Sequence, residues 1–151
     1  MAHPRRLTVA CLVGLFVIGG AALAAQTHED AAQAAAESWL TLVDGGDYLG
    51  SWDQAARVLK AGVKRAEWGE AMGEARSPLG KLVSRRLKSR EYTEKAPTTR
   101  VVGGKVYTWG SGKYVVIQYD TAFANKPSAV ETVIPMADPD GTWRVSGYSI
   151  R

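Results

Sequence analysis

The hydrophobic pattern of the chain changes its period once, near Leu82, and this change restricts the possible folds more than any other feature. Before Leu82, apolar residues recur every three or four positions, which is typical of amphipathic helices. After Leu82, β-branched and aromatic residues alternate with polar ones, and "KYVVIQYDTAF" (113–123) is the strongest strand pattern in the chain. Helices followed by antiparallel strands predict an α+β domain, with the helices packed on one face of a curved sheet.

Three helical segments are expected in the first half. Thr27 precedes two acidic residues and suits a helix start, and Asp44-Gly45-Gly46 marks the end of this helix. Asp47 can cap a short second helix that contains Tyr48 and Trp52. A third helix is expected before the Ser77-Pro78 step, because proline disfavours helix in the residue before it. Apolar faces formed by these residues should turn toward the core: Ala31, Ala35, Trp39, Leu42, Trp52, Trp68, Met72 and Ala75.

Four strands are expected in the second half, over residues 82–93, 113–123, 129–137 and 142–150. Asp138-Pro139-Asp140-Gly141 is typical of a turn between the last two strands rather than of a calcium loop, because the third acidic ligand and the closing glutamate are missing. Trp143 alternates with Val145 and is expected in the core.

Residues 96–112 connect the first two strands and predict a long hairpin loop or projecting β-arm. Its apolar content is too high for a plain linker. Tyr107 and Trp109 are therefore candidate contacts for a protein partner.

The N-terminus has the three parts of a secretory signal: Arg5-Arg6, an apolar run from Leu7 to Leu23, and small residues around Ala24. We expect cleavage near Ala24, which leaves residues 25–151 as one domain. A retained membrane anchor is the alternative, but the run is short for a span. Cys11 lies too early in the run to be a lipoprotein site, and its loss leaves no cysteine. An alanine-rich signal without disulfides favours a bacterial periplasm.

Charge and residue types exclude several functions. Removal of Arg5 and Arg6 lowers the net charge from +4 to about +2, which is small for a nucleic-acid-binding protein. His28 is the only histidine after the predicted cleavage, and its place at the new N-terminus predicts a solvated or capping role. No metal site or cofactor is predicted, and Ser-His or Cys-His catalysis is excluded for residues 25–151.

The most charged stretch, "SRRLKSREY" (84–92), predicts a strand with one wet basic face. Strand alternation groups Ser84, Arg86, Lys88 and Arg90 on the solvated side. Val83 and Leu87 should face the helices, which directs Arg85 to the interior. A buried guanidinium needs an anion, and Glu131 is the first candidate partner and Asp120 the second. If neither carboxylate reached Arg85, this residue would be the best candidate for holding an anionic ligand. The alternative is a β-bulge that turns Arg85 out to solvent.

Four stretches together carry a family resemblance: "AESWLTLVDGGDYLGSWDQAA", "EW…SPLGKLVSRRLKS", "YVVIQYDTAFANKPSAVETV" and "GTWRVSGYSIR". They resemble a family of exported bacterial proteins known as domain of unknown function 4019, from about Ala32 to Arg151. Arg100 to Gly112 looks like an insertion relative to that family, and the family implies no activity. A helical front followed by a sheet that ends in "DGTWRVSGYSI" also resembles the nuclear-transport-factor-2-like fold, in which a curved sheet wraps a long N-terminal helix and encloses a pocket. This fold implies no function by itself.

The combined prediction is a periplasmic domain, monomeric or homodimeric, that binds a small ligand or a protein without catalysis. Candidate ligand-binding residues are Arg85, Tyr119, Glu131 and Tyr148. A structural or protein-interaction module acting through the sheet or hairpin is one alternative. A pocket isomerase or dehydratase using carboxylate and tyrosine chemistry is another. An enclosed pocket with an unpaired polar group would favour a ligand, whereas a filled interior with an exposed apolar patch would favour a partner protein.

Overall fold

The structure is a computed structural model of the chain, and it describes residues 19–97, 100–102, 105–107 and 109–151. Of residues 19–23, 25, 100–102 and 105–107, only the backbone is described. Within these residues, the elements follow one another as four α-helices, a short 3-10 helix and six strands. The predicted α+β class, with helices first and antiparallel strands afterwards, is confirmed.

The helices are α1 (Gly19–Asp44), α2 (Tyr48–Asp53), α3 (Arg57–Gly62), α4 (Arg65–Arg76) and the 3-10 helix η1 (Ser77–Leu79). Three of them lie where the sequence predicts helices, although α1 begins before Thr27. The short helix α3 was not predicted, because its N-cap is Ala56, whose side chain makes no capping hydrogen bond.

A tight turn joins α1 to α2 and fixes the direction of both helices. Gly46 has a φ of 78°, which suits glycine, and the Asp47 N–H donates to the Leu42 carbonyl at 2.9 Å. The Asp47 carboxylate then accepts from the Gly50 N–H at 2.9 Å, as its predicted capping role requires. The predicted helix stop and helix start therefore meet in one loop.

The main sheet is antiparallel, with strand order β1-β4-β5-β6. Its strands are β1 (Leu82–Thr93), β4 (Tyr114–Phe123), β5 (Lys126–Ala137) and β6 (Trp143–Ile150). The remaining strands, β2 (Arg100–Val102) and β3 (Lys105–Tyr107), pair only with each other, within the predicted hairpin. Gly141, with a φ of 80°, turns the chain from β5 into β6, as the Asp-Gly sequence predicts.

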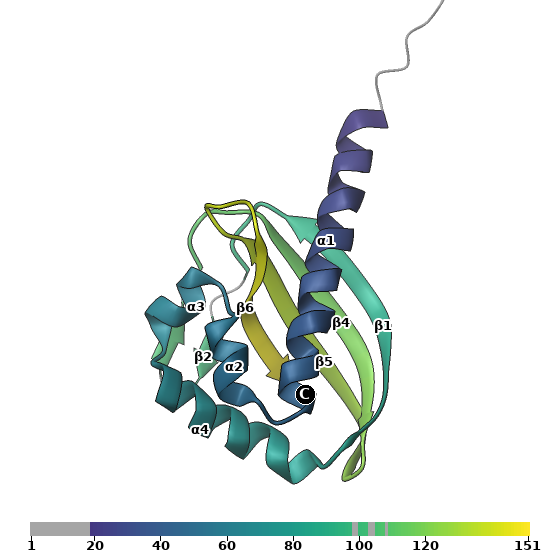
Figure 1. Cartoon of the computed structure of the whole chain (residues 1–151). Coiled ribbons are helices and arrows are strands. Elements are labelled where there is room, and N and C mark those ends of the chain that lie inside the picture. Colours follow the sequence, from purple (N-terminus) through teal and green to yellow (C-terminus); the bar gives the residue numbers. More distant parts are fainter. Residues whose placement is uncertain (1–18, 98–99, 103–104, 108) are drawn as a thin grey trace, which may run out of the picture.

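Helix α1 crosses the concave face of the sheet, and its first turns project beyond the sheet (Figure 1). The core lies between the two, and α1 contributes Trp39, Leu40 and Val43 to it. Ile117 and Val133 face them from the sheet and are fully buried. No helix in the described part of the chain is long and apolar enough to cross a membrane.

The tryptophans occupy the core to different extents. Trp39 is buried, as predicted, and its indole N–H donates to the Ser51 carbonyl. Trp68 and Trp143 are only partly buried, at the margin of the core. Trp52 is also half-buried and lies outside the core cluster. Its indole N–H donates to the carbonyl of Val63, the residue that follows α3.

Two irregularities in β1 correct the simple alternation predicted for this strand. The register with β4 shifts between Leu82 and Ser84 and again between Leu87 and Ser89. Val83 lies in the first shift and is 68% exposed, so its predicted packing against the helices is wrong. The second shift reverses the alternation, and Arg90 therefore lies opposite Ile117 on the helix face instead of in solvent.

The corrected position of Arg90 connects β1 to the first described turns of α1. Its guanidinium donates to Gln33 and pairs with Glu29 and Asp30. The predicted solvated role of His28 is also wrong, because its ring stacks on Tyr92 with the centroids 5.1 Å apart and is half-buried. Helix α1 thus packs on the sheet from His28 onward.

Candidate functional site

Arg85 is the centre of the charged site, and strand pairing places it opposite Thr121 on the helix face of the sheet. The Arg85 Nε donates to Glu131 Oε2 at 2.6 Å, and Nη1 donates to Asp44 Oδ2 at 2.6 Å. The Arg85 Nη2 donates to both carboxylates. The predicted contact with Glu131 is confirmed, and the alternative in which a bulge turns Arg85 to solvent is wrong because the two bulges flank this residue without including it.

These contacts determine the pKa of the Arg85 guanidinium. Burial alone would lower the pKa of Arg85, but hydrogen bonds to Asp44 and Glu131 outweigh it and raise the pKa above its usual range. Arg85 therefore stays charged, and it presents forked pairs of donors to two carboxylates.

Glu131 is fully buried, and every neighbour in its hydrogen-bond shell donates to it. Besides Arg85, the Thr121 hydroxyl donates to Oε2 at 2.7 Å and the Tyr148 hydroxyl donates to Oε1 at 2.5 Å. Burial, followed by the negative charge of Glu131, raises the pKa of the Tyr148 phenol well above its ordinary value. Tyr148 is thus a fixed neutral donor to Glu131.

Arg76, at the end of α4, joins the same cluster through Asp44. Its Nη2 donates to Asp44 Oδ1 at 2.9 Å, and its guanidinium carbon lies 4.3 Å from the centre of the Phe123 ring. Arg76 is buried, and its Nε and Nη1 make no hydrogen bond within the described part of the chain. The Phe123 ring attracts the charge through the flat face of the guanidinium, but it does not supply an acceptor for these two in-plane N–H groups.

We call this set the Arg85 network: Asp44, Arg76, Arg85, Thr121, Glu131 and Tyr148. Its two carboxylates balance its two guanidinium groups, and it joins α1, α4 and all four strands of the main sheet. Asp44 lies in the last turn of α1, where the helix dipole disfavours a negative charge, and the two arginines offset this cost. The donors of Arg85 and the oxygens of Glu131 are already hydrogen-bonded to each other, so the network holds α1 and α4 against the sheet. We call this stabilising role the clamp.

The second predicted partner of Arg85, Asp120, is on the opposite face of the sheet, so that prediction is wrong. Asp120 lies opposite Arg86 and accepts from Lys88 at 2.9 Å. The hydrogen bond from Lys88 lowers the pKa of the Asp120 carboxyl, with a further contribution from Arg86. Asp120 therefore belongs to a solvent-exposed charge pair.

Tyr119, another predicted ligand-binding residue, does lie on the helix face and is buried. Its hydroxyl has no hydrogen-bond partner within the described part of the chain. Burial, with a smaller contribution from the charge of Glu37, raises the pKa of the Tyr119 phenol to about 12. Tyr119 is adjacent to Glu131 across the β4–β5 pair but does not join the network.

The structure describes only one of the two side chains in the hairpin, Trp109 and Tyr107, that were predicted to contact a protein partner. Trp109 is half-buried and lies so close to β6 that a side chain added at Gly147 would meet its ring at 2.8 Å. Part of the Trp109 surface is therefore used within the domain. The side chain of Tyr107 lies outside the described residues, and both partner contacts stay predictions.

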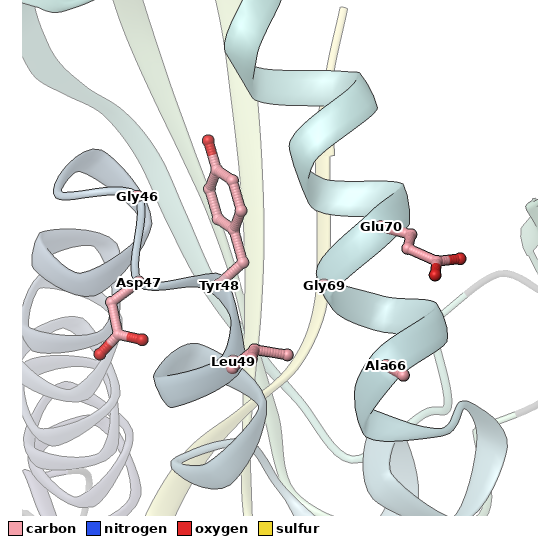
Figure 2. A pocket seen from close by; sticks show the side chains of 7 residues that line it. All are labelled: Gly46, Asp47, Tyr48, Leu49, Ala66, Gly69 and Glu70. Carbon is pink, nitrogen blue, oxygen red and sulfur yellow. The ribbon is translucent and has the colours of Figure 1, made fainter.

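A groove lies on another part of the surface, between the start of α2 with its preceding loop and α4 (Figure 2). We call it the α2–α4 groove. It has a volume of about 470 Å³, opens to solvent and is lined mainly by apolar atoms. Residues 46–49 form one wall, and Ala66, Gly69 and Glu70 form the other. Leu49 points toward α4, where the absence of a side chain at Gly69 makes room for it, since an added Cβ would lie 2.7 Å from Leu49.

Sequence reasoning missed Asp44, Arg76 and this groove. The sequence analysis interpreted Asp44 only as part of a helix stop, so its ion pairs with Arg76 and Arg85 were not predicted. Arg76 ends a helix in the sequence, and nothing local shows that it returns to α1. The groove depends on the small residues Ala66 and Gly69 at helical spacing, and this pattern was available in the sequence.

Fold and site together define a small α+β domain with a clamped interior and an apolar surface groove. Residues 35–148 match the family described as protein of unknown function (DUF4019), and the chain belongs to this family. This confirms the family predicted from the sequence. A search of curated proteins and a search of solved structures each found no match. The nuclear-transport-factor-2-like cone therefore stays a prediction.

Proposed function

We propose that the chain is an exported, non-catalytic domain that binds a protein partner, with the α2–α4 groove as its contact surface. One observation carries the proposal: Leu49, a large hydrophobic side chain, is 41% exposed in an open, mainly apolar groove. Exposed apolar surface in a hollow is typical of an interaction site.

Small-ligand binding at Arg85 has less support. The Arg85 guanidinium already serves two carboxylates, and Glu131, the best candidate base, is held by Arg85, Thr121 and Tyr148. A carboxylate that acts on a substrate must reach it, whereas Glu131 is fully buried. These contacts favour a stabilising role for the predicted ligand-binding residues.

Export to the periplasm is part of the proposal and has support from the path of α1. The first turns of this helix project from the body, and the first core residue of α1 is Ala32 (Figure 1). Cleavage near Ala24 would therefore leave the core intact. A fusion of residues 1–25 to a reporter that works only outside the cytoplasm should be active, and the mature chain should begin near Ala25. An intact 151-residue chain fixed in membranes would contradict this part.

The groove is tested with a photoreactive amino acid in place of Ala66, which lines it, and in place of Ala71, which is exposed on α4 outside it. After irradiation in cells that make the full chain, the protein with the probe at position 66 should form a discrete cross-linked protein product. The position 71 variant is the control. Equal products from both positions, or none from position 66, would contradict the groove as the contact surface.

A further inference from the structure

The chain contains two stretches rich in basic residues, and the structure engages them to different extents. Each cation of residues 84–92 has a carboxylate partner: Asp44 and Glu131 for Arg85, Asp120 for Arg86 and Lys88, and Glu29 and Asp30 for Arg90. Residues 57–65 include four cations and no acidic residue, and of these only Arg65 pairs with a carboxylate in the described part of the chain. We call the other three, Arg57, Lys60 and Lys64, the α3 patch.

The α3 patch forms one continuous surface. Arg57 and Lys60 are three residues apart on α3, a spacing that places both on one face of the helix. The Lys60 ammonium donates to the backbone carbonyl of Asp53. The carboxylate of the same residue binds Arg65, which follows Lys64. Arg57 and Lys64 are exposed, so the cationic groups line the surface from the start of α3 to the start of α4.

The positive charge at the start of α4 is not explained by the stability of this helix. Lys64 is its N-cap residue and Arg65 is its first residue. The helix dipole places a partial positive charge at this end, so a cation there is less favourable than an acidic or hydroxyl side chain. Glu67 offsets part of this charge, since its carboxylate accepts from the Lys64 backbone N–H at 3.4 Å. An arrangement that costs stability indicates another use for the cations.

The carboxylates of the neighbouring β5–β6 turn are engaged with another residue. Asp138 and Asp140 both pair with Arg144. Asp138 also accepts from the backbone N–H of Arg57 at 3.3 Å, but it bonds this backbone group and not the guanidinium. The α3 patch therefore remains positively charged. It lies on the side of the molecule opposite β1, because the residue before α3 is bonded to β6, the other edge of the sheet (Figure 1).

The spacing and surroundings of these cations favour an extended anionic surface as their partner. A single small anion requires donors that converge on one point, whereas the three cations follow α3 from its first residue to the residue before α4. Trp52 lies beside Lys60, with the ammonium 5.5 Å from the ring centre, and is half-buried. An amphipathic indole next to a cation is typical of residues at a membrane–water interface.

We infer that the α3 patch binds reversibly to an anionic phospholipid surface. Lipid phosphates neutralise its three cations, and Trp52 lies at the level of the headgroups. The contact is electrostatic and peripheral, since the exposed apolar side chain of α3, that of Ala61, is too small to insert deeply. An exported chain meets such a surface at the membrane that it crosses. The inference is independent of the protein that occupies the α2–α4 groove.

Binding is measured by sedimentation with vesicles of phosphatidylcholine alone or mixed with phosphatidylglycerol, which is anionic. The protein, as the cell processes it, should bind the mixed vesicles at least about tenfold more tightly, because each cation near an anionic surface adds affinity. Added sodium chloride should weaken this binding by screening. Inorganic phosphate at the same ionic strength should weaken it no more than chloride does, which distinguishes a lipid surface from a site for free phosphate.

Two substitutions test the α3 patch itself. Arg57→Gln and Lys64→Gln should each lower the affinity for the mixed vesicles by about fivefold, and the double variant by about 25-fold. Both side chains are exposed, so circular dichroism should show an unchanged fold. The matched control is Arg86→Gln with Lys88→Gln, which removes two cations from the opposite side of the molecule. It lowers the net charge equally and should stay within about twofold of the wild type.

A fluorescent label locates the contact. Ala61→Cys, exposed on α3, and Ala71→Cys, exposed on α4, each carry a polarity-sensitive dye. Both proteins also carry Cys11→Ser, so that the label has one site whether or not the signal is removed. On mixed vesicles the emission of the dye at position 61 should shift to the blue, whereas the emission at position 71 should not change.

The outcomes separate the α3 patch from unspecific attraction. Binding to mixed vesicles that is lost in the α3 double variant and kept in the β1 control supports the inference. Absence of binding, equal binding to both kinds of vesicle, equal losses in the two double variants, or a blue shift at position 71 as large as at position 61 overturns it. Stronger displacement by phosphate than by chloride overturns the lipid surface in favour of a free anion.

Discussion

Arg85 and Arg86 are neighbours in the chain with opposite environments. The Arg85 side chain is 13% exposed and lies 2.6 Å from each of two carboxylates. The Arg86 side chain is 83% exposed and lies 3.5 Å from Asp120. A salt bridge in water contributes little to stability, whereas removal of one member of a buried pair leaves an uncompensated charge. The face of the strand, rather than the residue type, decides what each arginine does.

The largest effect should come from Arg85→Ala. This change leaves Glu131 and Asp44 without their shared cation, and it should lower the free energy of unfolding by about 3 kcal/mol or more. Urea denaturation measures the loss. The double variant Arg85→Met with Glu131→Leu sharpens the comparison, because it removes the charge pair together and should be less destabilised than Arg85→Met alone. A loss as small as that of Arg86→Ala would refute the clamp.

Tyr148→Phe should have the next largest effect. It removes the hydrogen bond to a buried, ionised Glu131 and should cost about 2 kcal/mol. Tyr119→Phe is its matched control, because the Tyr119 hydroxyl has no partner among the described residues. That change should be neutral or slightly stabilising, within about 0.5 kcal/mol. Equal losses for the two variants in thermal or urea unfolding would contradict the assigned hydrogen bonds.

Alkaline pH should give an effect of about 1 kcal/mol at pH 11 from Tyr119. The folded pKa of Tyr119 is raised to about 12 from the ordinary value of 10.0. The folded state thus binds the phenolic proton more tightly, and this contribution is complete below pH 10 and lost as the pH rises toward 12. Tyr119→Phe should show a shallower decline in stability over this window than the wild type. Parallel pH profiles would mean that the phenol titrates normally.

The smallest changes in the free energy of unfolding should come from substitutions on the solvent-exposed face of β1. Arg86→Ala and Lys88→Ala should each change the free energy of unfolding by less than about 0.5 kcal/mol, because water screens their pairs with Asp120. Measured beside Arg85→Ala under the same conditions, they complete the comparison. A loss of more than 1 kcal/mol in either variant would show that the exposed pairs couple to the core.

The sequence was most informative where a local pattern determines the structure. The bounds of β1, the Asp47 cap and the Asp-Gly turn follow from adjacent residues and were predicted correctly. Arg85 was placed inside correctly, although the supporting assumption that Val83 and Leu87 are packed against the helices on either side of it was wrong: Val83 is 68% and Leu87 39% exposed. Register shifts depend on how β1 meets β4, and neither strand encodes them alone.

Long-range partners were predicted only in part. Glu131 was found because a buried arginine needs a carboxylate and few candidates stand on strands. Asp44 was missed, since its contact with Arg85 depends on where α1 ends above the sheet. The groove was missed although the small residues Ala66 and Gly69 mark one of its walls, because the sequence does not show that the start of α2 packs opposite them.

The two register shifts of β1 also affect how the protein behaves at high concentration. A long edge strand offers unpaired backbone groups, along which a strand of another molecule can align and start ordered aggregation. In β1 the straight run of such groups is interrupted at both shifts, and Arg86 and Lys88 on the outer face would repel a like strand laid against them. The irregular edge should therefore protect the sheet against fibril growth, and a straightened, uncharged β1 should remove that protection.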